Sequence, residues 1–81
     1  MGYHKTEIEK GILGEFSKIK EEFEELKDAV YQEDKILQMW ELSDLVGAIE
    51  SFCQNKFNLE LVDLVIFSDK TKSAFIENKR K

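Results

Sequence analysis

The chain has 81 residues, of which 36% are charged, with four glycines and no proline, and this composition favours helices over a turn-rich β fold. Its length allows one domain, and so small a domain buries only about 60–65% of the surface of its unfolded chain, so self-association is expected. The net charge of −5 excludes a sequence-independent grip on a nucleic-acid backbone, which needs a basic surface.

The first part of the chain is expected to form an arm and one amphipathic helix. Residues 1–10 are polar without a clear period, so we expect a flexible arm before a single helical domain of residues 11–81. His4 in this arm is interpreted as a solvated residue rather than a metal ligand. Apolar residues then recur at spacings of three and four, which predicts a helix from about Ile12 to Tyr31 with one buried stripe. The stripe consists of Phe16, Ile19, Phe23, Leu26 and Val30.

This first helix also carries an acidic side. Glu22 and Glu25 are neighbours at i and i+3 beside the apolar stripe, in line with Lys18 and Ala29. Glu21 is expected to point away from the core, which suits an outer-shell role or plain solvation. Taken alone, these acids would be interpreted as a solvated helix face.

A second helix is expected from about Lys35 to Lys56, after a turn at residues 32–34 in which Asp34 is the N-cap. It is apolar on two faces, which predicts burial on two faces. One face holds Leu42, Leu45, Ile49 and Phe52, and the other holds Ile36, Met39, Val46 and Cys53. Trp40 is expected in the core or at a subunit interface.

Two acids of the second helix lie among apolar neighbours. Glu41 and Asp44 share a stripe with Leu37 and Ala48, and charges in such a setting are costly unless they are paired or coordinate a metal. If the two helices pack antiparallel, the acid pairs of both helices can converge. Carboxylates about 4 Å apart repel by roughly 4 kcal/mol per pair at an effective dielectric constant near 20, so the cluster needs protons or a cation. Mg²⁺, which prefers oxygen ligands, suits such a site.

Cys53 is the only cysteine, so we expect a small buried hydrophobe, no internal disulfide and a reducing, cytoplasmic location. No apolar run approaches the roughly 20 residues of a membrane span, and no signal-peptide pattern is seen at the N-terminus.

A third helix is expected to begin near Leu59, with Asn58 as its N-cap. The β-branched run from Leu61 to Phe67 is also compatible with a strand. The charged continuation and the lack of a second strand to pair with favour a helix. The sequence therefore predicts an all-α fold, in which a helical hairpin and a third helix assemble into a four-helix-bundle-like core by oligomerisation.

The acids form a pattern that resembles a known family. Glu21-Glu22-x-x-Glu25 and Glu41-x-x-Asp44, with fifteen residues between them, resemble the EExxE and ExxD motifs of the MazG-type nucleoside triphosphate pyrophosphohydrolases. Three further stretches look like small phage and bacterial members of that family: residues 14–19, 44–46 and 68–75.

The resemblance implies cleavage of a (d)NTP to a (d)NMP and pyrophosphate, with a role in nucleotide-pool control. It implies that Mg²⁺, or Mn²⁺ in its place, is bound by Glu22, Glu25, Glu41 and Asp44. Glu21 is then the catalytic acid that orients or activates the water from the outer shell.

The same resemblance indicates the substrate contacts and the assembly. Lys56, Lys70 and Lys72 are the candidates for binding the phosphates, while Ser73 stands where a basic residue is expected. Small relatives work as homodimers or homotetramers, and no nucleic-acid polymer or membrane is expected as a partner.

Two other functions stay open. A non-catalytic helical interaction module would carry the same acids as a solvated face. Among enzymes, a phosphoribosyl-ATP pyrophosphohydrolase or a dUTPase-like relative uses comparable acids.

Overall fold

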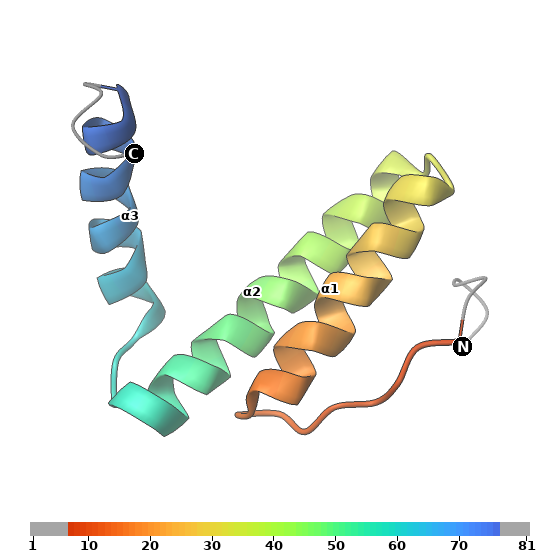
Figure 1. Cartoon of the computed structure of the whole chain (residues 1–81), viewed down its shortest axis with the longest axis horizontal. Coiled ribbons are helices and arrows are strands. Elements are labelled where there is room, and N and C mark those ends of the chain that lie inside the picture. The colour runs from red at the N-terminus through yellow and green to blue at the C-terminus, as the bar shows by residue number, and fades with distance from the viewer. Residues whose placement is uncertain (1–6, 77–81) are drawn as a thin grey trace.

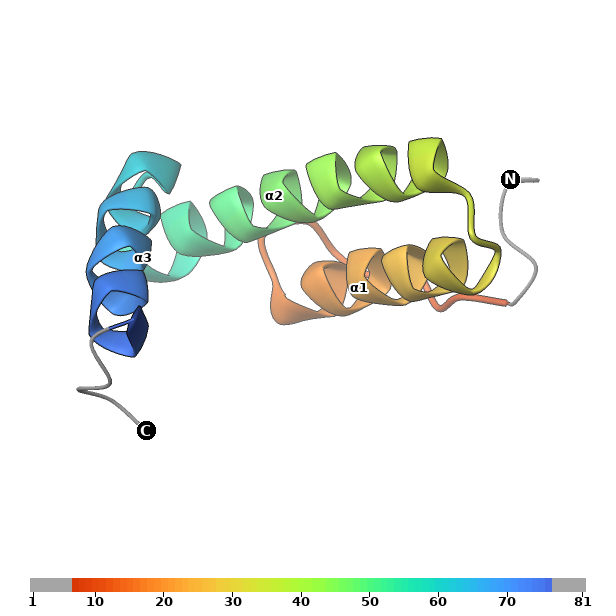
Figure 2. The ribbon, with the colours of Figure 1, turned by 90° about the horizontal axis from the view of Figure 1, so that it is seen from above.

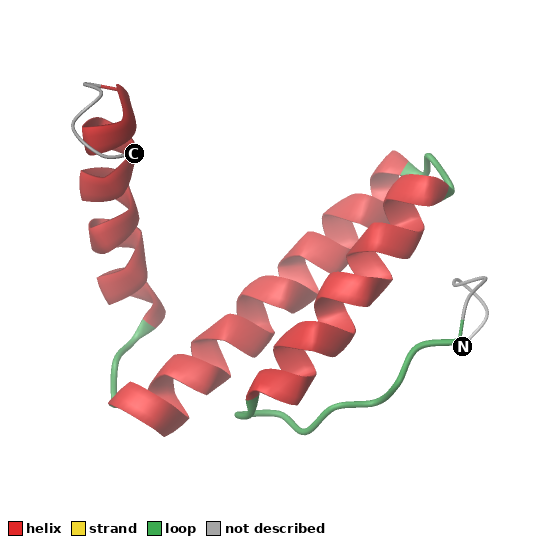
Figure 3. Ribbon diagram, in the orientation of Figure 1, coloured by secondary structure: helices red, strands yellow, loops and turns green. Residues whose placement is uncertain are grey.

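The computed structural model describes residues 7–76, and within that range it contains three helices and no strand. The helices are α1 (Phe16–Tyr31), α2 (Lys35–Phe57) and α3 (Leu61–Ile76). α1 and α2 run side by side as an antiparallel hairpin, and α3 leaves the C-terminal end of α2 at an angle (Figures 1 and 2). Loops alone join the helices (Figure 3). The predicted all-α fold class is confirmed, and so is the choice of a helix for the apolar run that opens α3.

The hairpin turn forms as the sequence predicts. The Asp34 side chain accepts a hydrogen bond from the Leu37 backbone N–H at 3.0 Å, which caps the start of α2. Glu33 has a positive φ of 56°, so the chain reverses within three residues. This short connection fixes which turns of α1 and α2 face each other.

α1 begins at Phe16 rather than at Ile12, because the chain before it is bent. Gly14 has a φ of +94°, which residues with a side chain rarely adopt, and its carbonyl accepts a hydrogen bond of 2.9 Å from the Asn55 amide. The Ser17 hydroxyl accepts the Ile12 N–H at 3.0 Å. The start of α1 is therefore tied to the last turns of α2.

The role predicted for Asn58 is wrong. Asn58 ends α2 in the left-handed conformation, with a φ of 56°, and its N–H donates to the Gln54 carbonyl at 3.2 Å. α3 begins at Leu61, where the Asp63 carboxylate accepts the Glu60 N–H at 2.9 Å. Asparagine is favoured both at an N-cap and at the left-handed end of a helix, so its identity alone does not choose between them.

The face that α1 and α2 share is not the one the apolar pattern predicts. The buried residues of the hairpin are small or acidic, and the helices meet at Ala29 and Ala48, which are 0% and 2% exposed. Phe16, Phe23 and Val30 of the predicted buried stripe are more than half exposed in the single chain. The acidic sides of the two helices thus face inward, and the large apolar side chains are exposed to solvent.

The exposed apolar surface continues over α2 and α3. Trp40 and Met39 on α2 and Val65 and Phe67 on α3 are all at least half exposed, whereas Cys53 is buried as predicted. α3 touches α2 but not α1. Among the described residues, no helix is both long and apolar enough to cross a membrane.

Candidate metal centre and active site

Four carboxylates from the two helices of the hairpin converge at its centre. α1 supplies Glu22 and Glu25, and α2 supplies Glu41 and Asp44. One oxygen of each residue lies within 4.8 Å of one oxygen of every other. The antiparallel arrangement brings the two i, i+3 pairs opposite each other, so the four candidate ligands named from the sequence form one cluster.

The cluster is closed on one side and open on the other. Glu22 and Glu41 are buried, Glu25 is half-buried and Asp44 is exposed. Ala48, which lines the same groove as Glu22, is also buried. Asp44 is therefore the acid of the cluster that is most accessible to solvent.

The electrostatics of the cluster fit a cation. Burial raises the pKa of Glu22, and the charge of Glu25 adds to this effect. Burial also raises the pKa of Glu25, which shares a hydrogen bond with Glu41. Oε1 of Glu22 is buried without a hydrogen-bond partner. Because oxygen is the ligand that Mg²⁺ and Ca²⁺ prefer, a set of four carboxylates with an unsatisfied buried oxygen fits a hard divalent cation.

Glu21, for which an outer-shell role or plain solvation was expected, is buried, with 3% of its surface exposed. The chain before α1 folds back over this side of the helix, so that Oε1 of Glu21 accepts the Gly11 N–H at 2.8 Å. Lys18 donates to the same oxygen at 3.0 Å, and Lys10 lies 3.7 Å from Oε2. Burial opposes the charged form, but the Gly11 and Lys18 hydrogen bonds outweigh it and lower the pKa of Glu21.

Gly11 makes this contact possible because it has no side chain. A Cβ at Gly11 would lie 2.2 Å from the Ser17 carbonyl oxygen, closer than real Cβ atoms come. Helical periodicity places Glu21 outside the hairpin and contains no information about a segment ten residues upstream. The burial of Glu21 was therefore not predictable from the pattern of α1.

Lys18 contacts the candidate site, although the sequence pattern did not assign it to the site. Its Nζ lies 3.0 Å from Oε1 of Glu21 and 3.1 Å from Oε2 of Glu22. The hydrogen bond to Glu21, together with that to Glu22, raises the pKa of Lys18, so it stays charged. The available signal was its spacing of four residues from Glu22, which places both on one side of α1.

The three lysines predicted to bind phosphate do not meet the acid cluster within one chain. Lys70 and Lys72 are exposed on α3, which does not contact α1, and Lys72 lies 3.6 Å from Asp69. Lys56 is exposed twelve residues after Asp44, which is about 18 Å along the helix axis.

A shallow, open groove adjoins the exposed side of the cluster. Its lining includes Glu22 and Asp44 of the cluster and also Lys18. The remaining lining comes from the loop before α1 and from successive turns of α2: Leu13, Ser43, Gly47, Ala48, Glu50 and Ser51.

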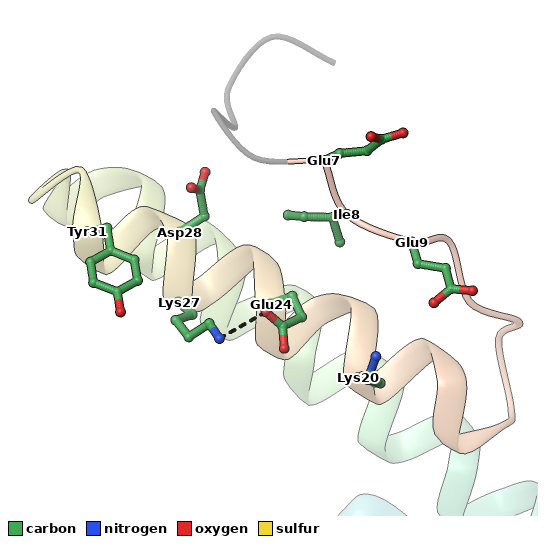
Figure 4. Close-up of a pocket in the computed structure, with 8 residues that line it drawn as sticks. All are labelled: Glu7, Ile8, Glu9, Lys20, Glu24, Lys27, Asp28 and Tyr31. Atoms are coloured by element: carbon green, nitrogen blue, oxygen red, sulfur yellow. Dashed lines mark ion pairs between the residues drawn. The ribbon is translucent and has the colours of Figure 1, made fainter.

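A second hollow lies on the outer side of α1, away from the four carboxylates. The segment before α1 forms one wall with Glu7, Ile8 and Glu9, and the ion pair of Glu24 and Lys27, 3.2 Å apart, lies opposite (Figure 4). Charges of both signs line it, and none of the four clustered acids belongs to it.

A comparison with known families identifies the class of protein to which this all-α hairpin with its four carboxylates belongs. The family model of phosphoribosyl-ATP pyrophosphohydrolase (PRA-PH) matches residues 2–67, more than half of the chain. The chain therefore belongs to the phosphoribosyl-ATP pyrophosphohydrolase family, whose members are hydrolases of a phosphoanhydride bond. No curated protein and no solved structure matches the chain.

The family match confirms the superfamily that the acidic motifs indicated, because PRA-PH and MazG-type enzymes both belong to it. It does not single out the MazG type. The prediction of a pyrophosphohydrolase is confirmed at the level of the family.

Proposed function

We propose that the protein is a Mg²⁺-dependent pyrophosphohydrolase that cleaves a (d)NTP between its α- and β-phosphates, in nucleotide-pool control. The observation that carries the proposal is the convergence of Glu22, Glu25, Glu41 and Asp44 within 4.8 Å. The MazG-like spacing of these acids supports a nucleoside triphosphate as substrate. The family match supports a second candidate, phosphoribosyl-ATP, which carries the same triphosphate group.

Each carboxylate has a distinct part in the proposed site. A divalent cation held by the four residues supplies charge neutralisation at the phosphates and a more acidic bound water. Glu22 and Glu41 hold it from the buried side, and Asp44 stands where substrate enters. Glu25, which is half-buried, completes the set of ligands.

Glu21 supports the site from outside the set of four. Its lowered pKa makes it a weaker proton acceptor, and its oxygens hold Gly11 and Lys18. We therefore assign Glu21 to orienting its neighbours, in preference to removing a proton from water.

The proposed active form is a homodimer or homotetramer. The exposed aromatic and aliphatic side chains of α1, α2 and α3 support this assembly, since monomeric proteins rarely expose large apolar patches. In such an assembly, Lys70 and Lys72 on α3 of one copy contact the phosphates bound at the acid cluster of a neighbouring copy. The arm of residues 1–10, the domain of residues 11–81 and the cytoplasmic location stay predictions.

The test is pyrophosphate release from a panel of ribo- and deoxyribonucleoside triphosphates and phosphoribosyl-ATP, with Mg²⁺, with Mn²⁺ and with a chelator. We expect release that requires the cation and is lost in Glu41→Gln, because the cluster loses one charged ligand. Glu24→Gln, a half-buried acid of α1 that belongs to neither the cluster nor the groove, is the matched control and should keep full activity.

The outcomes separate the proposed functions. Pyrophosphate release from a (d)NTP would support the MazG-like activity. Pyrophosphate release from phosphoribosyl-ATP alone would support the second candidate. If a folded protein releases no pyrophosphate from any substrate of the panel, and Glu41→Gln gives the same result, both candidate functions are contradicted. A non-catalytic interaction module is then favoured.

A further inference from the structure

Lys18 occupies the place where the acid cluster meets the groove. Its ammonium group bridges Glu21 and Glu22 at 3.0 and 3.1 Å, and its side chain is 28% exposed. The same residue lines the groove together with Glu22 and Asp44. A single cation thus touches the carboxylates and faces the open space beside them.

The contact between Lys18 and Glu22 becomes weaker when a divalent cation shares the same carboxylate. Glu22 gives Oε2 to Lys18, while its Oε1 is buried and lacks a hydrogen-bond partner. An ammonium group and a divalent cation on one carboxylate repel each other. The flexible four-carbon stem of lysine allows the ammonium group to move away from Glu22 while Lys18 stays in place on α1.

Gly47 lies in the groove and has no structural reason to be glycine within its own chain. A Cβ placed on it would meet nothing within 4 Å, and Gly47 has no positive φ. Glycine inside a helix destabilises it by roughly 0.5–1 kcal/mol relative to alanine. The missing side chain leaves the backbone of α2 open three residues beyond Asp44, beside Ser43 and Ser51.

We propose that this groove binds the phosphate chain of the substrate, and that Lys18 leaves Glu21 and Glu22 to contact the phosphates when the carboxylates hold a divalent cation. The inference rests on the proposed function and adds a phosphate contact that comes from the same chain as the acids. In the metal-free protein Lys18 neutralises part of the cluster, and in the loaded protein it neutralises part of the substrate. Gly47 provides the close approach that the phosphates need.

The first test compares Lys18→Met with Lys20→Met, an exposed lysine of the same helix, by calorimetric titration. The ligands are Mg²⁺ alone and a triphosphate with a non-hydrolysable α,β-methylene bridge in the presence of Mg²⁺. We expect Lys18→Met to weaken analogue binding by about 10- to 100-fold, as for the loss of one charged hydrogen bond. Mg²⁺ alone should bind at least as tightly, because Lys18 competes with it for Glu22. Lys18→Arg should restore much of the analogue binding.

A purely structural ion pair gives a different pattern. If Lys18 only holds Glu21 and Glu22 in place, Lys18→Met weakens Mg²⁺ and analogue together, and the proposal is wrong. Analogue binding equal to that of Lys20→Met also overturns it, while pyrophosphate release by the natural sequence would leave the proposed function intact. A natural sequence that neither binds the analogue nor releases pyrophosphate overturns both.

Gly47→Ala tests the path of the phosphates independently. Because the added methyl group meets open space and improves helix propensity, the variant should unfold at a higher urea concentration than the natural sequence. Its affinity for the analogue should fall about tenfold, since the methyl group lies where the phosphates pass. A more stable protein with unchanged analogue affinity would show that the phosphates do not follow this groove.

Discussion

At the scale of single residues, the hairpin buries charge where a small domain usually buries hydrocarbon. Glu21, Glu22 and Glu41 are each less than 6% exposed, although ionised side chains are rarely buried unless they are paired or bind a metal. Lys18 is the partner that the structure provides for two of them. Such an arrangement makes the stability of the metal-free hairpin depend on pH.

We expect the metal-free protein to become more stable as pH falls from neutrality towards about 4.5. The pKa values of Glu22 and Glu25 are raised above 4.5 in the folded chain, so the folded state binds more protons than the unfolded state in that window. The penalty for these charges is full above the folded pKa and is relieved on acidification. Glu21, whose pKa is lowered, acts in the opposite direction, and its contribution is lost only below that window.

Urea unfolding in the presence of a chelator at several pH values measures this effect. Mg²⁺ should stabilise the protein most at neutral pH, where the carboxylates are ionised. Glu22→Gln should flatten the pH dependence. If the urea midpoint of the metal-free protein falls steadily as the pH is lowered from neutrality to 5, the predicted sign of the pH dependence is wrong.

At the scale of the elements, the turn between α1 and α2 sets the register of the site. The chain reverses between Tyr31 and Lys35, so the faces of the two helices that meet are fixed by a short connection. Asp34 caps α2 through its hydrogen bond to the Leu37 N–H. The acid pairs sit two to three turns from this cap, so a change in the turn also shifts the alignment of the cluster.

Asp34→Ala should lower the free energy of unfolding by about 1 kcal/mol, within a range of roughly 0.5–2, because a helix N–H loses its acceptor. Asp34→Asn keeps an acceptor at the cap and is the matched control, with little expected change. Chemical denaturation followed by circular dichroism measures both variants. Equal losses for alanine and asparagine would point to the charge of Asp34 rather than to the cap.

At the scale of the whole molecule, the described part of the single chain leaves an apolar surface exposed, and we propose that a partner covers it. α3 is held by its contacts with α2 alone, and Val62, Val65, Ile66 and Phe67 on it are about half exposed. A second copy of the chain offers the same surfaces in return, as two-fold assemblies do. Burial of this surface is the physical basis for expecting a dimer or tetramer.

Sedimentation at micromolar concentration should therefore find a dimer or tetramer in the natural sequence. Phe67→Asp should shift it towards monomer, since a charge replaces an apolar contact in the proposed interface. Ser68→Asp introduces the same charge at the next residue and controls for charge itself. A monomer in the natural sequence, with α3 still helical, would contradict the proposed assembly.

The sequence alone determined the helices and the set of acids. Hydrophobic spacing, the Asp34 cap and the absence of proline are local features, so they predicted three helices close to their observed bounds. The acids at i and i+3 on two antiparallel helices could be matched in advance because helix periodicity fixes which residues share a side. The four candidate ligands could therefore be named from the sequence, before the structure was known.

Only the tertiary structure decided which faces meet. Periodicity assigns residues to a side of a helix but does not tell which neighbour that side meets. The apolar stripe of α1 was expected to be buried, but within the single chain Phe16, Phe23 and Val30 are exposed. In the folded chain Ala29 and Ala48 are buried together with Glu22 and Glu41, so the side that carries small and acidic residues faces inward. The contacts of Gly11 with Glu21, of Asn55 with Gly14 and of Lys18 with Glu22 likewise depend on how segments pack in space. These contacts turn a row of acids into an enclosed site with one open side.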